Sequence, residues 1–445
     1  MKQKNSEVQK LNKYLLESGK TLLVDGPATV TVLKGQANIL GFVLKPESRV
    51  VVQVGRRAPI TTDKKALLEI RLGEGGSVDE VEKSTIPESW EEAAERIIES
   101  EKPVRVIVLG GVDSGKTSLC TYLANRAALE GSKVGIIDAD LGQSDVGPPT
   151  TIGLGQIREP VSDLTKAEVV DAYLVGYTSP GRALDKVLEG MRVIIERAEK
   201  LDVDVLIINT DGWVDGAEAA DYKRRLVDIA KPDIILGIER EDELSDVLKT
   251  LNGKQIMHIE APPTIKRRDR EKRRLHRELS YRRYLEGAKV QSYPISWVKL
   301  QGCLPELGLP ATEERVSIVS EALGFTPYHC EENPRHMLII LGKNQEITDE
   351  AVKKLEEALE KDVKVLRKGD ERGVLVSLHG DDGRFLGIGV LRDIDFRRRI
   401  IRIYTPVEGK VSTICVGCVK LDEEGREVSF LGEETQEASD VKGEE

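Results

Sequence analysis

Cysteine, aromatic residues and long apolar runs are all scarce in this sequence. The 445 residues include five Cys, which is too few for a disulfide framework. The first 20 residues lack the apolar stretch of a secretory signal, and no window approaches the roughly 18 consecutive apolar residues that a membrane-spanning helix needs. We therefore expect a soluble protein of the reducing cytoplasm that has no membrane segment.

The composition favours a large folded protein. Hydrophobic residues make up 40% and charged residues 32% of the chain, which excludes wholesale disorder. With roughly 150 residues per domain, the length predicts two to four domains. Only 4% of the residues are aromatic and four are Met, while Glu, Lys and Arg are abundant. This bias is typical of thermophilic proteins, because ion pairs cost less to desolvate at high temperature.

Charge is distributed unevenly along the chain. The formal net charge is −11, which argues against a general nucleic-acid coat protein. Residues 266–283 nevertheless hold ten Lys or Arg and three acids, whereas residues 432–445 hold six acids and one Lys. An acidic average thus conceals one strongly basic segment.

The order of apolar runs predicts several domains. Between residues 20 and 72, short β-branched runs alternate with Gly and Pro about every ten residues, as in antiparallel sheets. From residue 104, strand and helix patterns alternate, which indicates a parallel sheet covered by helices. We expect an N-terminal β domain (1–98), an α/β domain (99–290) with a basic segment (about 264–284), a smaller, largely β domain (291–431) and a disordered acidic tail (432–445).

A phosphate-binding loop lies in the α/β domain. Residues 110–117 have the sequence GGVDSGKT, which fits G-x-x-x-x-G-K-[ST] between an apolar strand and a helix. Backbone N–H groups of such a loop face phosphate oxygens, while Lys116 would reach the terminal phosphates and Thr117 would ligate Mg²⁺. The predicted fold class is therefore α/β with a central P-loop NTPase sheet. The expected nucleotide-binding residues are Gly110, Gly111, Val112, Asp113, Ser114, Gly115, Lys116, Thr117 and Ser118.

Carboxylates follow the next strand. Asp138 and Asp140 end the apolar run VGIID, at the edge of a parallel sheet where ligands bind. Alternation along the strand directs both side chains to the same side. One could hold Mg²⁺ through water while the other meets an incoming nucleophile, or both could cap the following turn. Gln143 could orient either ligand.

Trp213 and the basic segment each have two interpretations. Trp213 follows the strand DVLII, where it is either a core anchor or a stacking clamp for a base or ribose. Arg270, Arg273, Arg274 and Arg277 would share one helix face. Such arginines could stabilise a transferring phosphoryl group or contact a polynucleotide backbone; the alternative is a solvated helix with internal ion pairs.

Several segments together resemble a known family. They are GGVDSGKTSLC, IDADLGQSDVGPPTTIG, YLVGYTSPGRAL, NTDGWVDG, and an RR-x-R-x-x-RR-x-x-R run leading into RRYLEG. In order and spacing they resemble the polynucleotide 5′-hydroxyl kinases related to the RNA kinase subunit of the messenger-RNA cleavage complex, most closely the archaeal members. The resemblance implies an N-terminal domain near the base, a central P-loop kinase domain and a C-terminal domain.

The resemblance also implies residue roles. Asp140 would act on the 5′-hydroxyl, and Trp213 would match a clasp tryptophan of the family that packs on the terminal nucleotide of the substrate. Gln143 and Thr178 would also lie on the substrate side. Lys116 and Thr117 would serve the phosphates and Mg²⁺. Asp138 extends the usual pattern of the family, and from their place at the strand end we include Asp138 and Asp140 with Thr117 in the expected metal site. Arg268, Arg273 and Arg277 would match arginines of a lid that contact the γ-phosphate. Arg57 would lie near the base.

The implied reaction transfers the γ-phosphate of ATP, with Mg²⁺ or a similar divalent cation, to the 5′-hydroxyl end of RNA, with DNA as a further acceptor. Two alternatives remain: a non-catalytic ATP-bound scaffold in RNA processing, and a P-loop switch ATPase. Elsewhere, Cys415 and Cys418 have the C-x-x-C spacing of half a zinc site or of a redox pair, with a structural pair or buried thiols as the alternative. The run from Phe396 to Tyr404 is either a strand with a charged face or a nucleic-acid contact.

Overall fold

We describe the chain from a computed structural model, which covers residues 11–251, 253–266 and 269–431. The chain divides into two compact units, residues 1–277 and 278–445, which are described separately below. The division falls inside helix α6 (Arg270–Tyr284). The expected acidic tail, residues 432–445, lies outside the described residues.

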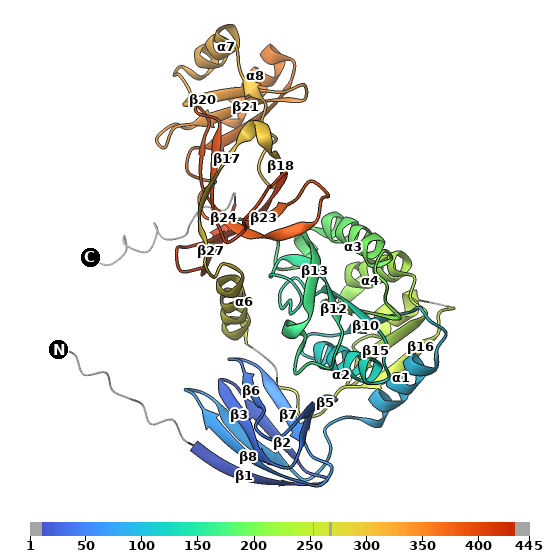
Figure 1. Cartoon of the computed structure of the whole chain (residues 1–445). Coiled ribbons are helices and arrows are strands. Elements are labelled where there is room, and N and C mark those ends of the chain that lie inside the picture. Colours follow the sequence, from blue (N-terminus) through green and yellow to red (C-terminus); the bar gives the residue numbers. More distant parts are fainter. Residues whose placement is uncertain (1–10, 252, 267–268, 432–445) are drawn as a thin grey trace, which may run out of the picture. The chain divides into compact units, whose positions relative to one another are not determined.

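Two antiparallel sheets form the N-terminal part of the first unit (Figure 1). Their orders are β1-β8-β3-β6 and β5-β4-β7-β2-β9. The strands are β1 (Leu11–Glu17), β2 (Thr21–Asp25), β3 (Ala28–Lys34), β4 (Ala37–Ile39), β5 (Phe42–Leu44), β6 (Arg49–Val52), β7 (Arg57–Thr61), β8 (Lys65–Leu72) and β9 (Ser77–Val81). Alternate residues of β3, namely Ala28, Val30 and Val32, are buried, because successive side chains of a strand point to opposite faces.

The second part of this unit is a helix-covered sheet in the order β13-β12-β11-β14-β10-β15-β16. Its strands are β10 (Val104–Gly110), β11 (Val134–Ala139), β12 (Thr151–Ile157), β13 (Glu168–Leu174), β14 (Val205–Thr210), β15 (Ile234–Glu239) and β16 (Ile256–Glu260). Its helices are α1 (Glu88–Glu99), α2 (Lys116–Leu129), α3 (Leu184–Ala198), α4 (Gly216–Ala230) and α5 (Ser245–Thr250). Five neighbouring strands of this sheet pair in parallel, as predicted, in the order β11, β14, β10, β15 and β16.

The remaining strands, β12 and β13, pair antiparallel at one edge of the sheet. Strand β12 was not predicted from the sequence, because its repeated glycines are atypical of strands. Gly153 is needed there: a Cβ atom at this position would lie 1.8 Å from the carbonyl oxygen of Val146. The strand therefore lies directly against the loop that follows β11.

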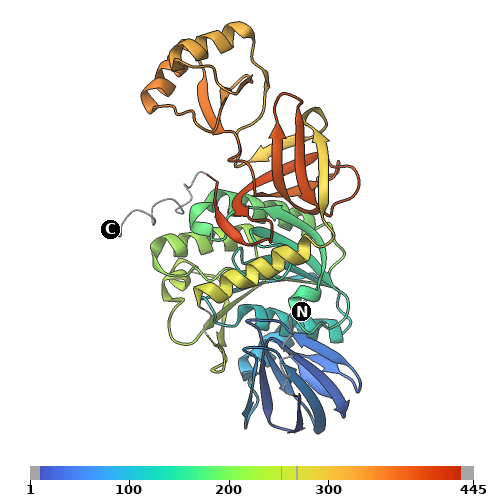
Figure 2. The same ribbon diagram turned by 90° about the vertical axis from the view of Figure 1, so that its left-hand side faces the viewer.

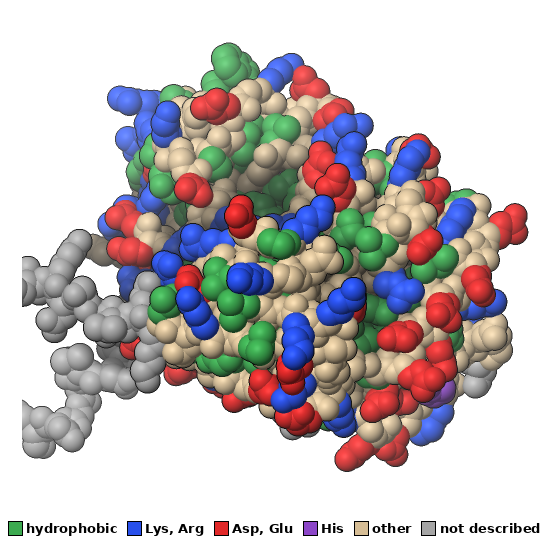
Figure 3. Space-filling view, turned by 60° about the horizontal axis from the view of Figure 1, so that its bottom comes forward, with side chains coloured by type: hydrophobic (Ala, Val, Ile, Leu, Met, Phe, Trp, Pro, Cys, Tyr) green, Lys and Arg blue, Asp and Glu red, His purple; other side chains and the backbone are tan. Residues whose placement is uncertain are grey.

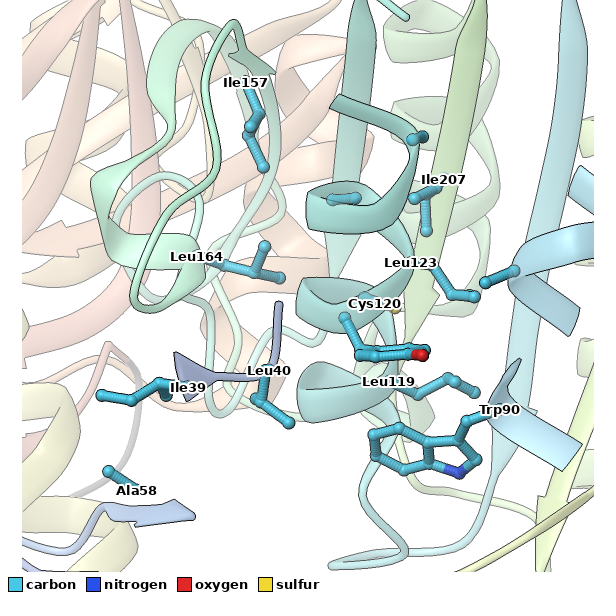
Figure 4. Close-up of a cluster of buried hydrophobic side chains, with 14 of the residues drawn as sticks. Ile39, Leu40, Ala58, Trp90, Leu119, Cys120, Leu123, Ile157, Leu164 and Ile207 are labelled. Atoms are coloured by element: carbon cyan, nitrogen blue, oxygen red, sulfur yellow. The ribbon is translucent and has the colours of Figure 1, made fainter. Parts of the chain in front are cut away.

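Helices cover both faces of the central sheet (Figure 1). One buried cluster combines the α1 and α2 side with the N-terminal sheets, and a second lies under α3 and α4. Figure 4 shows Leu40, from the N-terminal sheets, next to Leu119 and Cys120 of α2. The side chain of Asn125 also donates to the carbonyl oxygen of Leu40 over 2.8 Å. A shared core thus joins the N-terminal sheets to the central sheet in one unit.

The second unit contains two further sheets. A larger sheet has the order β17-β25-β24-β23-β26-β18, with β27 paired to β26, and a smaller one the order β19-β20-β21-β22. The elements are β17 (Lys289–Pro294), β18 (Lys299–Gly302), β19 (Leu309–Pro310), α7 (Glu313–Leu323), β20 (His329–Glu332), β21 (His336–Leu341), α8 (Asp349–Leu359), β22 (Asp362–Arg367), β23 (Val374–His379), β24 (Phe385–Asp395), β25 (Ile400–Thr405), β26 (Thr413–Leu421) and β27 (Glu427–Phe430). In Figure 2, α7 and α8 lie on one side of the smaller sheet.

Helix α7 was not predicted. The side chain of Thr312 caps it by accepting from the backbone N–H of Arg315, and Gly324, with φ 74°, ends it. Only Val319 of this helix is fully buried, so its apolar periodicity is weak in the sequence. Tertiary contact with α8 and the smaller sheet stabilises it instead.

The cysteines pair differently from the C-x-x-C expectation. Cys418 forms a disulfide with Cys303, 115 residues away, and Cys415 is a free thiol. No group of three or more metal-binding side chains occurs among the described residues. A redox pair between Cys415 and Cys418 is thus wrong, because two strands that are distant in sequence bring Cys303 within bonding distance.

The arginines of the 396–404 run have partners within their own unit. Arg399 bonds to Glu331 over 2.8 Å and Arg402 to Asp393 over 2.8 Å. The guanidinium of Arg397 lies 5.0 Å from the ring centroid of Tyr328. Strand β24 ends at Asp395 and β25 begins at Ile400, so Arg397 and Arg399 lie in the turn between these strands. The interpretation as a strand therefore holds only for residues 400–404.

No helix within the described ranges is long and apolar enough to cross a membrane.

Both signs of charge are interspersed on the face shown in Figure 3. The net charge of −11 therefore does not form a continuous acidic field on that face.

Candidate active site

The phosphate loop joins β10 to α2, and Gly115, with φ 106°, precedes the first turn of the helix. Lys116 is buried, and its Nζ donates to the carbonyl oxygen of Gly111 over 2.6 Å. Burial lowers the pKa of the Lys116 ammonium, and the nearby Asp140 opposes this shift. The loop therefore holds a cation and a helix N-terminus at one place, which suits a polyphosphate.

Asp138 organises the loop that follows β11. Its Oδ2 accepts from the backbone N–H groups of Asp145 and Val146 over 2.7 and 3.2 Å. Its Oδ1 accepts from the backbone N–H of Asp140 over 3.2 Å and from the side chain of Asn209 over 3.0 Å. Burial, with Asp145 and Asp140 nearby, raises the pKa of Asp138 to about 7. Both of its oxygens are engaged with the protein, which disfavours direct contact with a substrate.

Asp140 is placed differently, beyond the end of the strand. Its Oδ1 accepts from the backbone N–H groups of Gly142 and Gln143 over 3.1 and 3.0 Å. Burial raises the pKa of Asp140, whereas the Lys116 ammonium lowers it. Two backbone amides thus fix one oxygen, and the carboxylate remains close enough to the phosphate-loop lysine to interact with its charge.

Asn209 was missed by our sequence analysis. It lies at the end of β14, between β10 and β11, and its Nδ2 reaches Asp138 and, over 3.4 Å, the Oγ1 of Thr117. The Oδ1 of Asn209 and the Oγ of Ser114 are both buried without a hydrogen-bond partner. Its position directly before Thr210 and Asp211, at the end of a strand, is the sequence signal that could have identified it.

These orphaned polar atoms fit a nucleotide and its metal. Buried polar groups normally have partners, and phosphate oxygens or metal-bound water would supply them here. Mg²⁺ in nucleotide sites usually binds one or two carboxylates together with substrate phosphates. The donor set of Thr117, Asp138 and Asp140 agrees with such a site, although no larger metal-binding cluster exists in the described part of the chain.

Trp213 lies beside this site on the loop after β14. Its ring stacks on that of Tyr222, with centroids 5.7 Å apart and an interplanar angle of 29°. It is half-buried and packs against the second buried cluster. A Cβ atom on Gly181 would lie 3.8 Å from the outer edge of the indole. One part of the ring is therefore anchored in the core, and the remainder is accessible.

Thr178 belongs to the same surroundings. Its carbonyl oxygen lies 3.0 Å from the position of a Cβ atom on Gly142, so the segment before Gly181 contacts the loop that carries Asp140. Thr178 is half-buried. The predicted substrate residues Gln143, Thr178 and Trp213 thus come from loops that lie next to one another.

Of the arginines that the resemblance assigns to a lid, Arg273 on α6 contacts the phosphate loop. The guanidinium of Arg273 bonds to Asp113 of the phosphate loop over 2.9 Å, and the Arg273 carbonyl accepts from the side chain of Gln143 over 3.2 Å. Arg277, one helical turn further on, is half-buried. Arg268 lies outside the described residues. Arg273 therefore contacts the phosphate loop directly.

A second contact of α6 was not predicted. Arg56 forms two hydrogen bonds with Asp145, one of them over 3.0 Å, and its Nη2 lies 3.0 Å from Nε2 of His276. All three side chains are largely buried. An arginine of the N-terminal sheets thus connects the loop after Asp140 to the lid helix.

Arg57 is engaged with the protein. Its guanidinium forms a bidentate pair with Asp25, at 2.7 Å for both bonds, and donates to the carbonyl oxygen of Thr264 over 2.7 Å. The next residue, Ile265, lies 2.5 Å from where a Cβ atom of Gly115 would be. Arg57 therefore holds the segment that covers the phosphate loop, and Asp25 is a further residue that the sequence did not reveal.

Comparisons with known proteins agree with this site. The family model described as mRNA cleavage and polyadenylation factor CLP1 P-loop matches residues 110–287. A polyribonucleotide 5′-hydroxyl-kinase from Thermococcus kodakarensis is 31% identical over 352 residues, which cover 78% of this chain and 96% of that protein. The chain belongs to the polyribonucleotide 5′-hydroxyl-kinase family.

Other comparisons support this kinase family and its fold. A polyribonucleotide 5′-hydroxyl-kinase from Methanocaldococcus jannaschii is 28% identical over 352 residues, covering 78% of this chain and 95% of that protein. A solved complex of Clp1p with Pcf11p shares 15% identity and has a TM-score of 0.66, covering 93% of this chain and 98% of that chain. The predicted family and α/β fold class are confirmed, and membership of a P-loop kinase family implies ATP binding.

Proposed function

We propose that this protein is an ATP-dependent kinase that phosphorylates the 5′-hydroxyl end of RNA. The observation that carries the proposal is its membership of the polyribonucleotide 5′-hydroxyl-kinase family, combined with a phosphate loop whose Lys116 lies close to the Asp140 carboxylate. Phosphoryl transfer needs mainly positioning and charge stabilisation. A buried lysine, a helix N-terminus and a carboxylate at one site are suited to both.

In the reaction, the 5′-hydroxyl oxygen attacks the γ-phosphorus while the bond to the ADP oxygen breaks. Asp140 accepts the hydroxyl proton, as a general base must lie within hydrogen-bond reach of its acid. Two backbone amides hold its other oxygen, so the carboxylate is fixed before the substrate arrives. The products are ADP and a 5′-phosphorylated RNA end.

Charge on the transferring group is stabilised from two directions. Lys116 lies on the nucleotide side, and moving its Nζ from the Gly111 carbonyl to a phosphate would exchange one hydrogen bond for a stronger, charge-assisted one. Arg273 approaches from the lid and already contacts Asp113 of the loop. We assign Arg268 and Arg277 to the same lid from the family resemblance.

We assign the divalent cation to Thr117, Asp138 and Asp140. Mg²⁺ would neutralise phosphate charge there when bound. Because the oxygens of Asp138 accept protein hydrogen bonds, Asp138 would hold the cation through water, with the unpartnered Asn209 oxygen close by.

We also propose that the protein acts in the cytoplasm, where the RNA ends would be produced and consumed. The Cys303–Cys418 disulfide is compatible with this compartment, because intracellular proteins of hyperthermophiles often contain disulfides. The match to archaeal kinases supports that setting.

The test is transfer of labelled γ-phosphate from ATP to RNA and DNA oligonucleotides of the same sequence with 5′-hydroxyl ends. Wild type should label RNA, and Lys116→Ala and Asp140→Asn should not. Lys249→Ala, an exposed lysine on α5 paired with Asp246, is the matched control and should retain activity. Tight ATP binding without any labelled oligonucleotide would contradict the proposal and favour an ATP-bound scaffold. ATP hydrolysis as fast without RNA as with it would favour a switch ATPase.

A further inference from the structure

Beneath the acceptor side of the site lies a buried charge cluster that the reaction described above does not use. Asp211 follows β14, and Tyr222 and Lys223 lie on α4. Tyr222 and Lys223 are 1% and 0% exposed. A lysine is almost never fully buried unless it is paired, so its contacts indicate what it does.

The hydrogen bonds of Tyr222 and Lys223 converge on Asp211. Lys223 Nζ lies 3.0 Å from the Asp211 carboxylate and donates to the Asp211 carbonyl oxygen over 2.8 Å. The Tyr222 hydroxyl donates to the same carboxylate over 2.7 Å. The carboxylate also accepts from the backbone N–H of Trp213 over 2.9 Å. The backbone and the side chain of Asp211 are therefore both fixed.

The loop that Asp211 holds in place packs against the phosphate loop and also carries Trp213. Trp213 stacks on the same Tyr222 ring whose hydroxyl binds Asp211. At Gly212, a Cβ atom would lie 2.7 Å from the backbone N and Cα of Val112, in the phosphate loop. The short segment from Asp211 to Trp213 thus packs against the phosphate loop at one point and presents an indole at the next residue.

Stability alone is a poor explanation for this arrangement. A buried ion pair often contributes no more to stability than apolar side chains of the same volume. What it can provide is a single geometry, because a displaced loop would leave a buried charge unpaired. Burial lowers the pKa of Lys223 while Asp211 and Asp140 raise it, so the lysine also compensates negative charge beside the catalytic carboxylate.

We propose that Asp211, Tyr222 and Lys223 are positioning residues that hold Trp213 as a rigid stacking platform for the terminal nucleotide of the acceptor. The inference rests on the proposed function and on the clasp role that the family resemblance implies for Trp213, and it adds three positioning residues to them. Stacking of a base on an aromatic ring is sequence-tolerant, which suits an enzyme that must accept any 5′ end. A rigid platform would also lose little conformational entropy when the nucleotide binds.

The test uses the full chain with Tyr222→Phe, Lys223→Met and the double variant Asp211→Asn/Lys223→Met. Arg224→Met is the matched control, because Arg224 is the next residue of α4 and pairs with Asp221 and Asp228 on the surface. Steady-state transfer gives KM for the oligonucleotide, and equilibrium titration gives the Kd of ATP. The chain has three Trp, so 5-fluorotryptophan labelling should give three ¹⁹F signals, with Trp213→Phe identifying the relevant one.

We expect Lys223→Met to raise KM for the oligonucleotide by about tenfold, since stacking of one base contributes roughly 5- to 150-fold in affinity. The Kd of ATP should change less than twofold. The Trp213 ¹⁹F signal should broaden or move, and Tyr222→Phe should cause a smaller change in the same direction. Arg224→Met should alter neither quantity.

Unchanged KM and an unchanged Trp213 signal in Lys223→Met would overturn the inference. If that variant does not fold, the double variant and Tyr222→Phe decide by the same criteria, because neither leaves a buried charge unpaired. If the wild-type protein transfers no phosphate, the proposed function is wrong, but the inference about Trp213 is still testable. The inference is then decided by whether a 5′-hydroxyl oligonucleotide shifts the Trp213 signal in wild type and fails to do so in the double variant.

Discussion

The nucleotide side and the acceptor side of this site are assembled in different ways. The phosphate-binding part of the nucleotide side is one contiguous segment, residues 110–118, from the end of β10 to the first turn of α2. The acceptor side combines the loop after β11, the segment around Thr178, the loop after β14 and helix α6. A contiguous loop owes its geometry to local backbone preferences, whereas a composite surface depends on how distant elements pack. The following predictions test this difference.

The largest effect should come from the lid, where the two sides meet. Arg273→Ala should lower kcat by about 10³-fold or more, because an arginine that stabilises the transferring phosphoryl group has this order of effect in related chemistry. The Kd of ATP should rise by less than about tenfold. Single-turnover transfer and ATP titration measure the two quantities, with Arg224→Ala, at an exposed arginine of α4, as control. A variant defective only in ATP binding would show that Arg273 belongs to the nucleotide side alone.

A second prediction concerns the acceptor side. Asp140→Asn should lower kcat by about 10² to 10⁴-fold, the usual range for loss of a general base. ATP binding should persist, because the amide still accepts the two backbone hydrogen bonds that fix the Asp140 side chain. Rapid-quench transfer compared with ATP titration separates the two effects. Equal loss of ATP binding and of turnover would show that Asp140 acts mainly through the nucleotide and its metal.

The Arg56 contact should matter for stability. Arg56→Met leaves the buried Asp145 carboxylate without its bidentate partner, which should lower the free energy of unfolding by about 3 kcal/mol. Thermal or denaturant unfolding measures this. Asp145→Asn in addition should restore part of the loss, whereas Arg49→Met, on the exposed side of β6, should change little. If Arg56→Met alone is as stable as wild type, the connection between the N-terminal sheets and α6 is not needed for stability.

The disulfide should stabilise the second unit and leave catalysis unaffected. Cys303→Ser with Cys418→Ser opens a loop of 115 residues and should lower stability by about 2 kcal/mol. Thermal unfolding should show the change under oxidising conditions only, since a reductant removes the difference from wild type. Transfer activity at moderate temperature should remain. If the double variant and wild type unfold at the same temperature with and without reductant, the disulfide does not contribute to stability.

The smallest effect is expected for Asp25. The Arg57 guanidinium and Lys266 hold the pKa of this carboxyl far below its usual range, although burial opposes them. The contribution of Asp25 to stability is therefore present above the ordinary carboxyl pKa and is lost as the pH falls through the lowered value. Asp25→Asn should cost about 1 kcal/mol at pH 7, with a smaller cost in strong acid. Asp63→Asn, at an exposed position, is the control. A cost that is independent of pH would contradict the ion-pair explanation.

Much of the fold followed from local pattern. The alternating strand and helix runs from residue 104 form the helix-covered sheet, because a strand with apolar residues on both faces must be buried on both. Strand β12 and helix α7 were not found: β12 needs Gly153 against the Val146 carbonyl, and α7 buries only Val319. In both cases tertiary contacts override weak local preference.

The residues of the site also divide into those that local sequence reveals and those that only tertiary contacts bring together. The sequence by itself determined the phosphate loop and the positions of Asp138 and Asp140, because neighbours in the chain are necessarily neighbours in space. Tertiary structure alone decided that Asn209 reaches Thr117, that Lys223 neutralises Asp211, and that Arg56 connects Asp145 to His276. Each of these contacts joins different segments of the chain, and only the packing of the sheets, helices and loops brings their side chains within hydrogen-bonding distance.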